Sequence, residues 1–255
     1  GDFFFFFDVH EPSRGENSMN TNLLQTARIT INGDTLSPIA IYKRLQGKRK
    51  FLLERSLKHD ASGRYSFIGA EPVKEFKGSA QELKETSFLS GQVINHYGKP
   101  LELLKTLLPV INEHDEFPFN GGAVGYIGYD VISQYEDIGP PLHDDRGMPD
   151  IHLLVYETVI VYDHLKQDVT ILHTGNNPSK IEEVEHQLAV KESEVVPTTS
   201  PLPFTSNITK QTFIDNVLRA KGLIRAGEIF QVVLSQRLQA PFSGDSFSLY
   251  RKRIK

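Results

Sequence analysis

The sequence contains few residues whose types and spacing point to chemistry by themselves. Its nine histidines are scattered, and no HxH or HExxH spacing would place two of them on one metal ion. The chain has no cysteine, which excludes thiolate metal ligands, a disulfide framework and a cysteine nucleophile. It also lacks the GxSxG turn that presents a nucleophilic serine. These patterns therefore support neither histidine-based metal binding nor nucleophilic catalysis.

Two charged positions and one glycine-rich stretch are the remaining candidates. Arg64, between a glycine and a tyrosine, suits either an anion contact or a structural ion pair. Asp144 and Asp145 lie among glycines and prolines, which favours a solvated loop over an acid–base pair. In PFNGGAVGYIGYD three glycines recur at every third position, but the lysine of a phosphate-binding loop is missing. We interpret these glycines as sites of close backbone packing in a sheet.

The charge balance of the chain argues against two classes of partner. Lysine and arginine number 28 against 32 acidic residues, which gives a net charge of −4. A weakly acidic chain has no general attraction to phosphate groups, and no basic cluster stands out, so we expect no nucleic-acid partner. We also expect no membrane association, because no apolar run reaches the roughly 18 residues that a spanning helix needs. Together with the absence of cysteine, this predicts a cytoplasmic protein.

Hydrophobic periodicity predicts an α+β mixture of elements that would position these residues. Strands are predicted by alternating and β-branched residues at 23–31, 51–54, 64–71 and 229–238, and as a hairpin within 151–175. Helices are predicted by apolar residues at helical spacing at 37–47, 99–114, 178–188 and 209–227, with another starting near 249. Ser37 and Thr209 are expected to cap their helices, Pro38 to take a first helical position, and Pro109 to end or kink the segment 99–114.

The two ends of this pattern suggest how the chain is organised. Residues 1–18, which include five consecutive phenylalanines, share no pattern with the rest of the chain and precede Met19. We predict that they are a non-native leader and that translation naturally begins at Met19. The codons for residues 14–16 can form a purine-rich bacterial ribosome-binding sequence, which would lie a few bases before the Met19 codon. The alternative is a genuine extension with an adhesive or membrane-touching tip. The Pro-, Ser- and Thr-rich segment 191–207 predicts a linker between residues 19–190 and 208–255.

Three motifs then resemble the large subunit of anthranilate synthase, component I. They are FLLERSLKHDASGRYSFIG, GGAVGYIGYD and AKGLIRAGEIFQVVLSQRL, and the match extends from about Pro38 to the end of the chain. The resemblance implies an α+β fold of mainly antiparallel sheets with helices packed outside. It also implies that residues 19–190 form the N-terminal region and that 208–255 begin the chorismate-binding domain, which would be incomplete at the C-terminus.

The resemblance further implies an activity, a metal and partners. This family converts chorismate and ammonia to anthranilate and pyruvate, the first committed step of tryptophan biosynthesis. The ammonia would come from glutamine through a partner amidotransferase subunit, component II. In the full-length enzyme Mg²⁺ would bind the substrate and offset negative charge as the ring hydroxyl leaves. Tryptophan would act as a feedback inhibitor.

Gln231, in the motif GEIFQVVLSQ, is the catalytic residue that the resemblance implies. The water-using relatives, isochorismate and salicylate synthases, carry a lysine there as a general base. A neutral amide does not remove a proton from water, so Gln231 suits an enzyme whose nucleophile is already ammonia. The alternative is that Gln231 is a strand residue that hydrogen-bonds its neighbours.

The inhibitor contacts implied by the resemblance are Glu54, Arg55 and Ser56. Residues 52–54 match the LLES motif of the family, but Arg55 stands where serine is expected. The spacing from Glu54 to Arg64 equals that of the relatives, so an insertion does not explain the change. We predict weakened tryptophan inhibition, because a long cation would lie near a small indole pocket. The alternatives are that Ser56 takes over after a local bulge, or that Arg55 is a tolerated surface substitution.

The resemblance also implies what the chain does not contain. In the family, the magnesium-binding glutamates, the catalytic histidine and the NPSPY segment of the inhibitor pocket come after the matched motifs. We therefore expect no metal ligand and no cofactor contact within residues 1–255, and no activity from this chain alone. The alternatives are aminodeoxychorismate synthase component I, which usually has asparagine near Val233 and rarely reads GRYSFIG, and a non-catalytic tryptophan-binding regulatory module.

Overall fold

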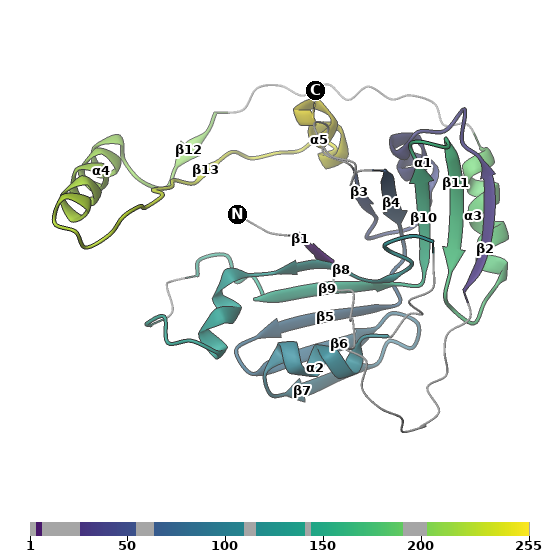
Figure 1. Cartoon of the computed structure of the whole chain (residues 1–255), viewed down its shortest axis with the longest axis horizontal. Coiled ribbons are helices and arrows are strands. Elements are labelled where there is room, and N and C mark those ends of the chain that lie inside the picture. The colour runs from purple at the N-terminus through teal and green to yellow at the C-terminus, as the bar shows by residue number, and fades with distance from the viewer. Residues whose placement is uncertain are drawn as a thin grey trace. The chain divides into compact units, whose positions relative to one another are not determined.

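The computed structural model of the chain describes residues 4–6, 26–54, 64–109, 116–140, 144–190 and 203–254 (Figure 1). The chain divides into two compact units, Gly1–Glu192 and Ser193–Lys255. The boundary falls within the segment that was predicted as a linker, 191–207. The assignment of separate roles to the two parts stays a prediction.

The first unit contains a six-stranded sheet in which every neighbouring pair is antiparallel. In order across the sheet, its strands are β1 (Phe4–Phe6), β8 (Gly122–Ile127), β9 (Ile151–Tyr156), β5 (Lys74–Ser79), β6 (Glu82–Ser87) and β7 (Val93–Tyr97). The pairing of β1 with β8 adds three residues of the predicted leader to the edge of this sheet. That the leader is non-native stays a prediction.

A five-stranded antiparallel sheet runs crosswise to the first (Figure 1). Its strands, in order, are β2 (Ala27–Asn32), β11 (Asp168–His173), β10 (Thr158–Asp163), β4 (Tyr65–Gly69) and β3 (Phe51–Leu53). Two of the connections between the sheets are short. The chain runs from β9 to β10 through the single residue Glu157, and from β4 to β5 through residues 70–73. These short crossings hold the two sheets against each other.

Aromatic side chains fill the space between the two sheets. The Phe51 and Tyr156 rings meet edge to face with their centroids 4.6 Å apart, and Phe67 meets Phe119 in the same way at 5.7 Å. The buried members of this cluster are Phe51, Phe67, Phe117, Phe119, Tyr156, Val159, Val161 and Leu172. The Tyr156 hydroxyl donates a hydrogen bond to the Arg49 carbonyl at 2.6 Å, so its one polar atom is satisfied.

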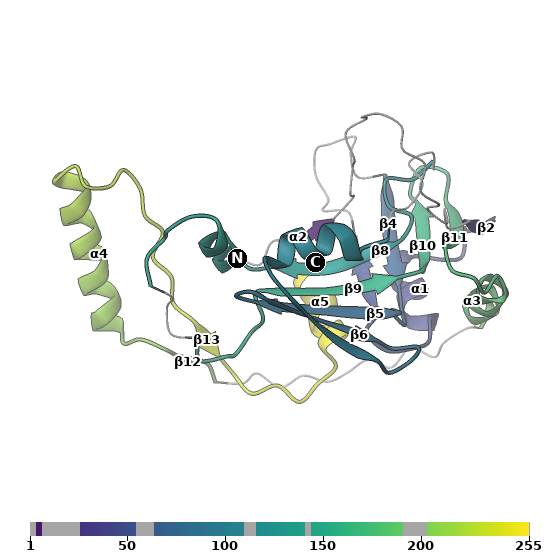
Figure 2. The ribbon, with the colours of Figure 1, turned by 90° about the horizontal axis from the view of Figure 1, so that it is seen from below.

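Helices cover the outer faces of both sheets, which confirms the predicted fold class (Figures 1 and 2). Helices α1 (Pro38–Arg44) and α3 (Ser179–Ala189) pack on the five-stranded sheet through a core that includes Ile41, Ile160 and Val184. Helix α2 (Pro100–Leu107) packs on the six-stranded sheet, and a 3₁₀ turn (Tyr129–Gln134) adds Val131 to the same core. The buried members of that core are Phe76, Leu83, Leu104, Leu108, Ala123, Val131, Ile151, Leu153 and Val155.

Local signals in the sequence explain where these helices begin and end. The Ser37 hydroxyl accepts a hydrogen bond from the Ala40 amide at 3.2 Å, and Pro38 takes the first helical position, as predicted for α1. The helix predicted over 99–114 ends at Leu107, near Pro109, which was expected to end or kink it because proline can neither donate to a helix nor fit into its interior.

Among the strands missed from the sequence are β5, β6 and β7. The segments of β5 and β6 are rich in lysine and glutamate, which have low strand propensity, and β7 is a short segment with an asparagine and a histidine at its centre. Positions in β5 and β6 nevertheless alternate between buried and solvated, since Phe76 and Leu83 are fully buried on one face. Packing against α2 and the neighbouring strand β9 therefore decides their conformation.

Gly125 confirms the interpretation of the glycine-rich stretch as a site of close backbone packing. This glycine lies in β8 opposite Leu153 of β9. A Cβ atom built on it would lie 1.9 Å from the carbonyl oxygen of His152, well inside van der Waals contact. Any side chain at this position would therefore push the two strands apart.

The second unit contains α4 (Lys210–Arg225), α5 (Ser246–Ile254) and a two-stranded ribbon of β12 (Thr205–Ser206) with β13 (Leu238–Gln239). The Thr209 hydroxyl accepts from the Thr212 amide at 3.1 Å and caps α4 as predicted. The strand predicted over 229–238 is wrong for nearly its whole length, because only Leu238 joins a described strand. Arg237 extends the ribbon, because its backbone carbonyl accepts from the Asn207 amide and its own amide donates to the Asn207 side chain. Residues 229–236 lie beside no described strand, and a strand forms only where a neighbour satisfies its backbone.

Candidate functional site

Glu54, the first of the predicted inhibitor contacts, comes directly after β3 and is half-buried. Leu53 pairs with Phe67, so the same antiparallel register carries Glu54 alongside Ser66 of β4. Ser66 is fully buried, and its hydroxyl lies 2.8 Å from Nε2 of His164. Glu54 therefore lies at the rim of a small polar group at one end of the five-stranded sheet. Arg55 and Ser56 lie outside the described residues, and their roles stay predictions.

Arg64 and Asp163 form an ion pair at the same end of the sheet. The Arg64 Nε atom donates to both Asp163 carboxylate oxygens at 3.0 Å, and a terminal nitrogen donates to Oδ2 at 2.5 Å. The same carboxylate accepts from the backbone amides of Leu165 and Lys166 in the turn after β10. Of the two alternatives for Arg64, the structure therefore shows structural ion pairing.

The surroundings of Asp163 keep it ionised. Burial by itself would raise the pKa of this carboxyl group, but the Arg64 guanidinium and the turn amides outweigh burial and hold the pKa below its ordinary value. Arg64 also lies over the Tyr65 ring, 5.0 Å from its centroid, and Tyr65 meets Phe117 edge to face at 5.4 Å. This end of the sheet thus combines an acidic side chain, a fixed cation and aromatic rings.

Two acid–histidine–lysine groups on the six-stranded sheet escaped the sequence analysis. Glu75 accepts from His152 at 2.9 Å and from Lys77 at 3.1 Å. Glu85 lies on the opposite face, and it accepts from Lys74 at 2.8 Å and His96 at 2.9 Å. Burial would raise the pKa of both glutamates, but these donors hold it below the ordinary value. No local spacing could have revealed the groups, because the histidines come from other strands.

The Glu85 group leads to a prediction about acid stability. Its folded-state pKa is lowered, so its contribution is complete above the ordinary glutamate pKa and is lost as the pH falls through the folded value. We expect Glu85→Gln to lower the free energy of unfolding by about 1–2 kcal/mol at pH 7 and by less at pH 3. Urea titrations at both pH values measure this difference. Glu82→Gln, at an exposed site on the same strand, is the control, and an equal loss in both variants contradicts the prediction.

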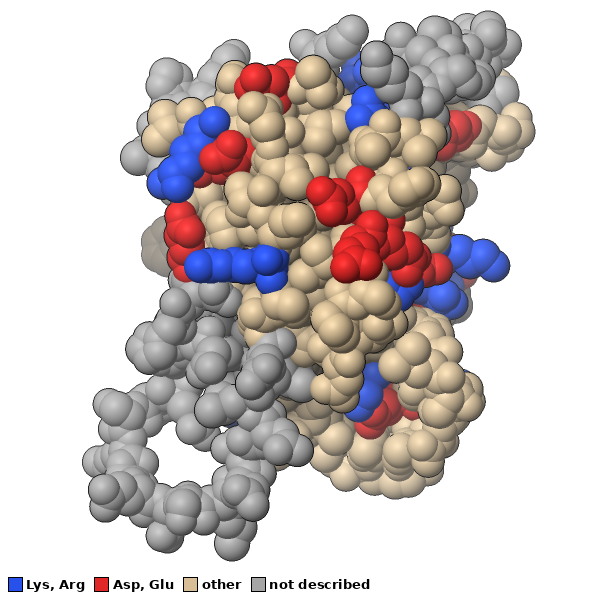
Figure 3. Space-filling model, turned by 90° about the vertical axis from the view of Figure 1, so that its right-hand side faces the viewer, with Lys and Arg blue, Asp and Glu red and all other residues tan. Residues whose placement is uncertain are grey.

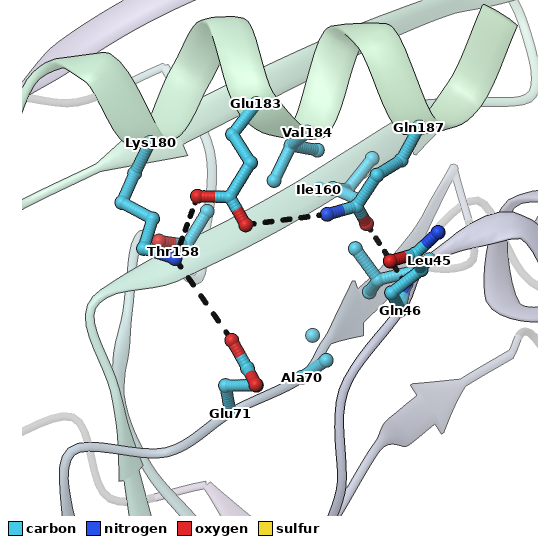
Figure 4. Close-up of a pocket in the computed structure, with 11 residues that line it drawn as sticks. Leu45, Gln46, Ala70, Glu71, Thr158, Ile160, Lys180, Glu183, Val184 and Gln187 are labelled. Carbon is cyan, nitrogen blue, oxygen red and sulfur yellow. Dashed lines mark hydrogen bonds and ion pairs between the residues drawn. The ribbon is translucent and has the colours of Figure 1, made fainter.

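A small pocket lies between α3, the end of α1 and the end of β4 (Figure 4). Lys180 reaches across it, 2.7 Å from Glu183 and 3.9 Å from Glu71. The Gln187 side-chain carbonyl accepts from the Gln46 amide at 2.8 Å. The volume is about 50 Å³, well below the roughly 300 Å³ at which sites for drug-sized ligands begin. The polar side chains that line this pocket pair with one another. These contacts link α3 to the segments that follow α1 and β4.

The charged surface around α3 is solvated. Acidic and basic side chains both occur on the face that carries this helix (Figure 3), and Glu182 and Glu183 are exposed. Asp144 is also exposed, and its carboxylate accepts from the backbone amides of Arg146 and Met148 within a loop, as predicted. Within the described ranges, no three His, Asp or Glu side chains come together in a way that could hold a metal ion.

Gln231, the predicted catalytic residue, is exposed and lies in the second unit, whereas Glu54 belongs to the first. It precedes β13 in a stretch without regular structure, so the alternative of a paired strand residue is not seen in the described chain. Its catalytic role stays a prediction. As for the helices, none in the described part is long and apolar enough to cross a membrane.

Comparison with known proteins decides the family. The model of a family described as chorismate binding enzyme matches residues 48–255, most of the chain. The chain belongs to the chorismate-binding enzymes. This confirms the resemblance on which the fold and activity were predicted.

Individual chorismate-binding enzymes show the extent of the match. Anthranilate synthase component 1 of Lactococcus lactis is 36% identical over 87% of this chain and 50% of its own length, and that of Acetivibrio thermocellus is 34% identical over 87% and 49%. The crystal structure of anthranilate synthase component I from Streptococcus pneumoniae is similar with a TM-score of 0.63 and 33% identity, covering 93% of this chain and 52% of that one. The chain thus spans about half the length of these relatives.

Proposed function

We propose that this chain is the N-terminal part of an anthranilate synthase large subunit, which forms anthranilate and pyruvate from chorismate and ammonia. The observation that carries the proposal is the family match over residues 48–255, joined to relatives of 32–36% identity that all bear this name. Glutamine, hydrolysed by an amidotransferase subunit, is the proposed source of ammonia. The cysteine-free composition supports a cytoplasmic enzyme.

Gln231 is the residue of this chain that we assign to the nucleophile side of the reaction. A side-chain amide offers a carbonyl oxygen as acceptor and an NH₂ group as donor, and it does not titrate near neutral pH. It can therefore orient ammonia but cannot generate hydroxide from water. Magnesium, when bound to such an enzyme, supplies charge neutralisation on the substrate. Among the described residues, no group of side chains fits this ion.

We assign the rim that contains Glu54 to tryptophan. Its carboxylate can accept hydrogen bonds from an α-ammonium group. Arg55 departs from the serine of the family motif in this region. A guanidinium there would repel the ammonium group and crowd the indole.

This assignment leads to a prediction for position 55. In the assembled enzyme, Arg55→Ser is expected to lower the tryptophan concentration for half-inhibition at least tenfold, a change of about 1.4 kcal/mol. Inhibition curves at fixed chorismate concentration measure it. Arg55→Lys is the matched control, because it keeps the positive charge and should leave inhibition weak. Equal inhibition of the parent enzyme and Arg55→Ser would show that Arg55 is a tolerated surface substitution.

A second candidate function is a non-catalytic tryptophan-binding module. It is favoured by one observation, that the buried core clusters lie in the first unit together with Glu54. Calorimetry on the chain alone separates the two functions. If the chain is part of an enzyme, neither chorismate nor tryptophan should bind with micromolar affinity. Micromolar tryptophan binding without chorismate binding would instead favour the module.

A further inference from the structure

The strand β7 forms one outer edge of the six-stranded sheet (Figure 1). Three of its five residues are apolar and exposed, with exposed fractions of 76% at Tyr97, 51% at Val93 and 39% at Ile94. The strand contains no lysine, aspartate, glutamate or proline. Natural sheets protect their edges with such residues, because an unpaired edge is a template for another strand. The edge at β7 is therefore apolar and lacks this protection.

The strand β2, which forms an edge of the five-stranded sheet, shows the opposite pattern. Its exposed positions are the polar residues Arg28, Thr30 and Asn32. Its apolar residues Ile29 and Ile31 are partly buried and pack against the core that α1 and α3 cover. The apolar side chains of β2 thus belong to the core of this chain, whereas those of β7 are exposed to solvent.

The backbone of β7 presents every second residue to the outer edge. The β6–β7 ladder is continued at one end by a hydrogen bond from the Ser87 amide to the Gln92 carbonyl, and at the other by one from Gly98 to Gln81. Hydrogen-bonded and non-bonded pairs alternate along antiparallel strands, so the even-numbered residues of β7 bond to β6. Among the described strands, none pairs with the other side of β7. The residues whose amide and carbonyl groups point to that side are Val93, Asn95 and Tyr97.

A second copy of β7 fits this edge in the antiparallel orientation. A two-fold axis at Asn95 places this residue opposite its own copy, and it places Val93 opposite Tyr97 of the partner subunit. Each residue in these pairs directs its backbone to the edge, so every pair is of the hydrogen-bonded type. A valine and a tyrosine on one face form a favourable cross-strand pair, and two asparagine amides can each donate and accept. The strand is therefore complementary to itself.

We propose that β7 pairs with β7 of a second copy of this chain and joins two six-stranded sheets into one continuous sheet. Addition of a strand to an exposed edge gains backbone hydrogen bonds, and the side chains on the strand determine which partner fits. Here the side chains fit a second copy, because they are apolar or uncharged and bring no two like charges together. The dimer uses no residue that was assigned to the reaction, so it can be tested separately from the proposed function.

The experiment measures sedimentation equilibrium and amide hydrogen exchange of this chain between about 1 and 500 µM. We expect a reversible dimer with a dissociation constant of about 10–100 µM, as suits a small interface. In the dimer, the amides of Asn95 and Tyr97 should exchange about tenfold more slowly or less, and those of Ile94 and His96 should be unchanged because β6 already holds them. A monomer at every concentration, or a dimer with unchanged exchange at Asn95, would overturn the proposal. Slow exchange at Asn95 in the monomer would also overturn it, since another segment of the same chain would then cover the edge.

Matched substitutions separate β7 from other exposed apolar sites. Tyr97→Lys places a charge on the edge, and Leu165→Lys places the same charge at a residue of equal exposure, 76%, in the turn between β10 and β11. Asn95→Pro removes the central amide of the edge, and an edge strand tolerates proline where the amide points outward. We expect the dissociation constant to rise at least tenfold for Tyr97→Lys and Asn95→Pro, and less than twofold for Leu165→Lys.

Two further measurements complete the test. Thermal unfolding of Tyr97→Lys should match that of the parent, because Tyr97 is exposed, and this shows that the variant loses pairing rather than its fold. Leu218→Asp changes an exposed apolar residue of the second unit and should leave the dimer intact. A dimer that survives Tyr97→Lys and Asn95→Pro but is lost in Leu218→Asp would place the contact in the second unit and refute the proposal.

Discussion

Gly125→Ala is expected to unfold the first unit or to reduce its free energy of unfolding by about 3 kcal/mol or more. The added methyl group would lie 1.9 Å from the carbonyl oxygen of His152, a backbone atom that no rotamer change can move. Relief requires β8 and β9 to separate, and these strands pair along their whole length from Gly122–Tyr156 to Ile127–Ile151. The clash therefore acts within the six-stranded sheet, on a pair of strands that carries much of its core.

Urea unfolding monitored by circular dichroism measures this effect, and Gly222→Ala is the control. A Cβ at Gly222 would meet nothing within 4 Å, and this glycine lies inside α4. Alanine is the better helix former by about 1 kcal/mol, so this variant should be neutral or stabilising. An unchanged unfolding midpoint for Gly125→Ala would show that the two strands are not packed as described.

Asp163→Ala is expected to cost about 2–3 kcal/mol of stability at pH 7, the second large effect. The substitution removes a nearly buried carboxylate that accepts from Arg64 and from the backbone amides of Leu165 and Lys166. The Arg64 guanidinium and the two turn amides would then lose their shared hydrogen-bond acceptor. Since the turn joins β10 to β11, the damage should appear as loss of the five-stranded sheet and the Glu54 rim.

The pKa of Asp163 determines how the stability difference between the parent and Asp163→Ala changes with pH. The pKa of Asp163 is lowered in the folded state, so its contribution is complete above the ordinary aspartate pKa and disappears as the pH falls through the folded value. The gap between parent and Asp163→Ala should therefore narrow below about pH 4. Glu116→Ala is the control, because its ion pair with Lys166 is exposed and should contribute less than about 0.5 kcal/mol. A gap that stays constant down to about pH 2 would contradict the role assigned to this carboxylate.

Those parts of the fold with strong local patterns could be predicted from the sequence. The hairpin of β10 and β11 is predicted by β-branched residues on both sides of a short polar turn, and α3 by three apolar residues at helical spacing. The strands β5 and β6 were missed, because their charged residues obscure an alternation that becomes evident only when α2 and β9 pack against them. For residues 229–238 the prediction erred in the opposite direction. Their composition predicts a strand, but only Leu238 joins a described strand.

Some residues of the candidate site could be predicted from sequence motifs, whereas others were found only from the structure. Motif order identified the family and directed attention to Glu54 and Gln231, which no periodicity singles out. The alternatives for Arg64 were resolved only by the position of Asp163, which is 99 residues away along the chain. The Glu75 and Glu85 groups depend on sheet register and have no signature in one sequence. Chemistry that several strands assemble is therefore visible only once their pairing is known.

The measurement that tests the central proposal most directly is product analysis of the chain combined with the other half of a chorismate-binding enzyme. Chorismate, ammonium and Mg²⁺ are supplied, and anthranilate fluorescence and pyruvate are measured together. The account predicts anthranilate and pyruvate in equal amounts, and a rate that falls at least a hundredfold in a Gln231→Ala variant whose complex still forms. An aminated chorismate without pyruvate release, or equal rates with Gln231→Ala, would contradict it.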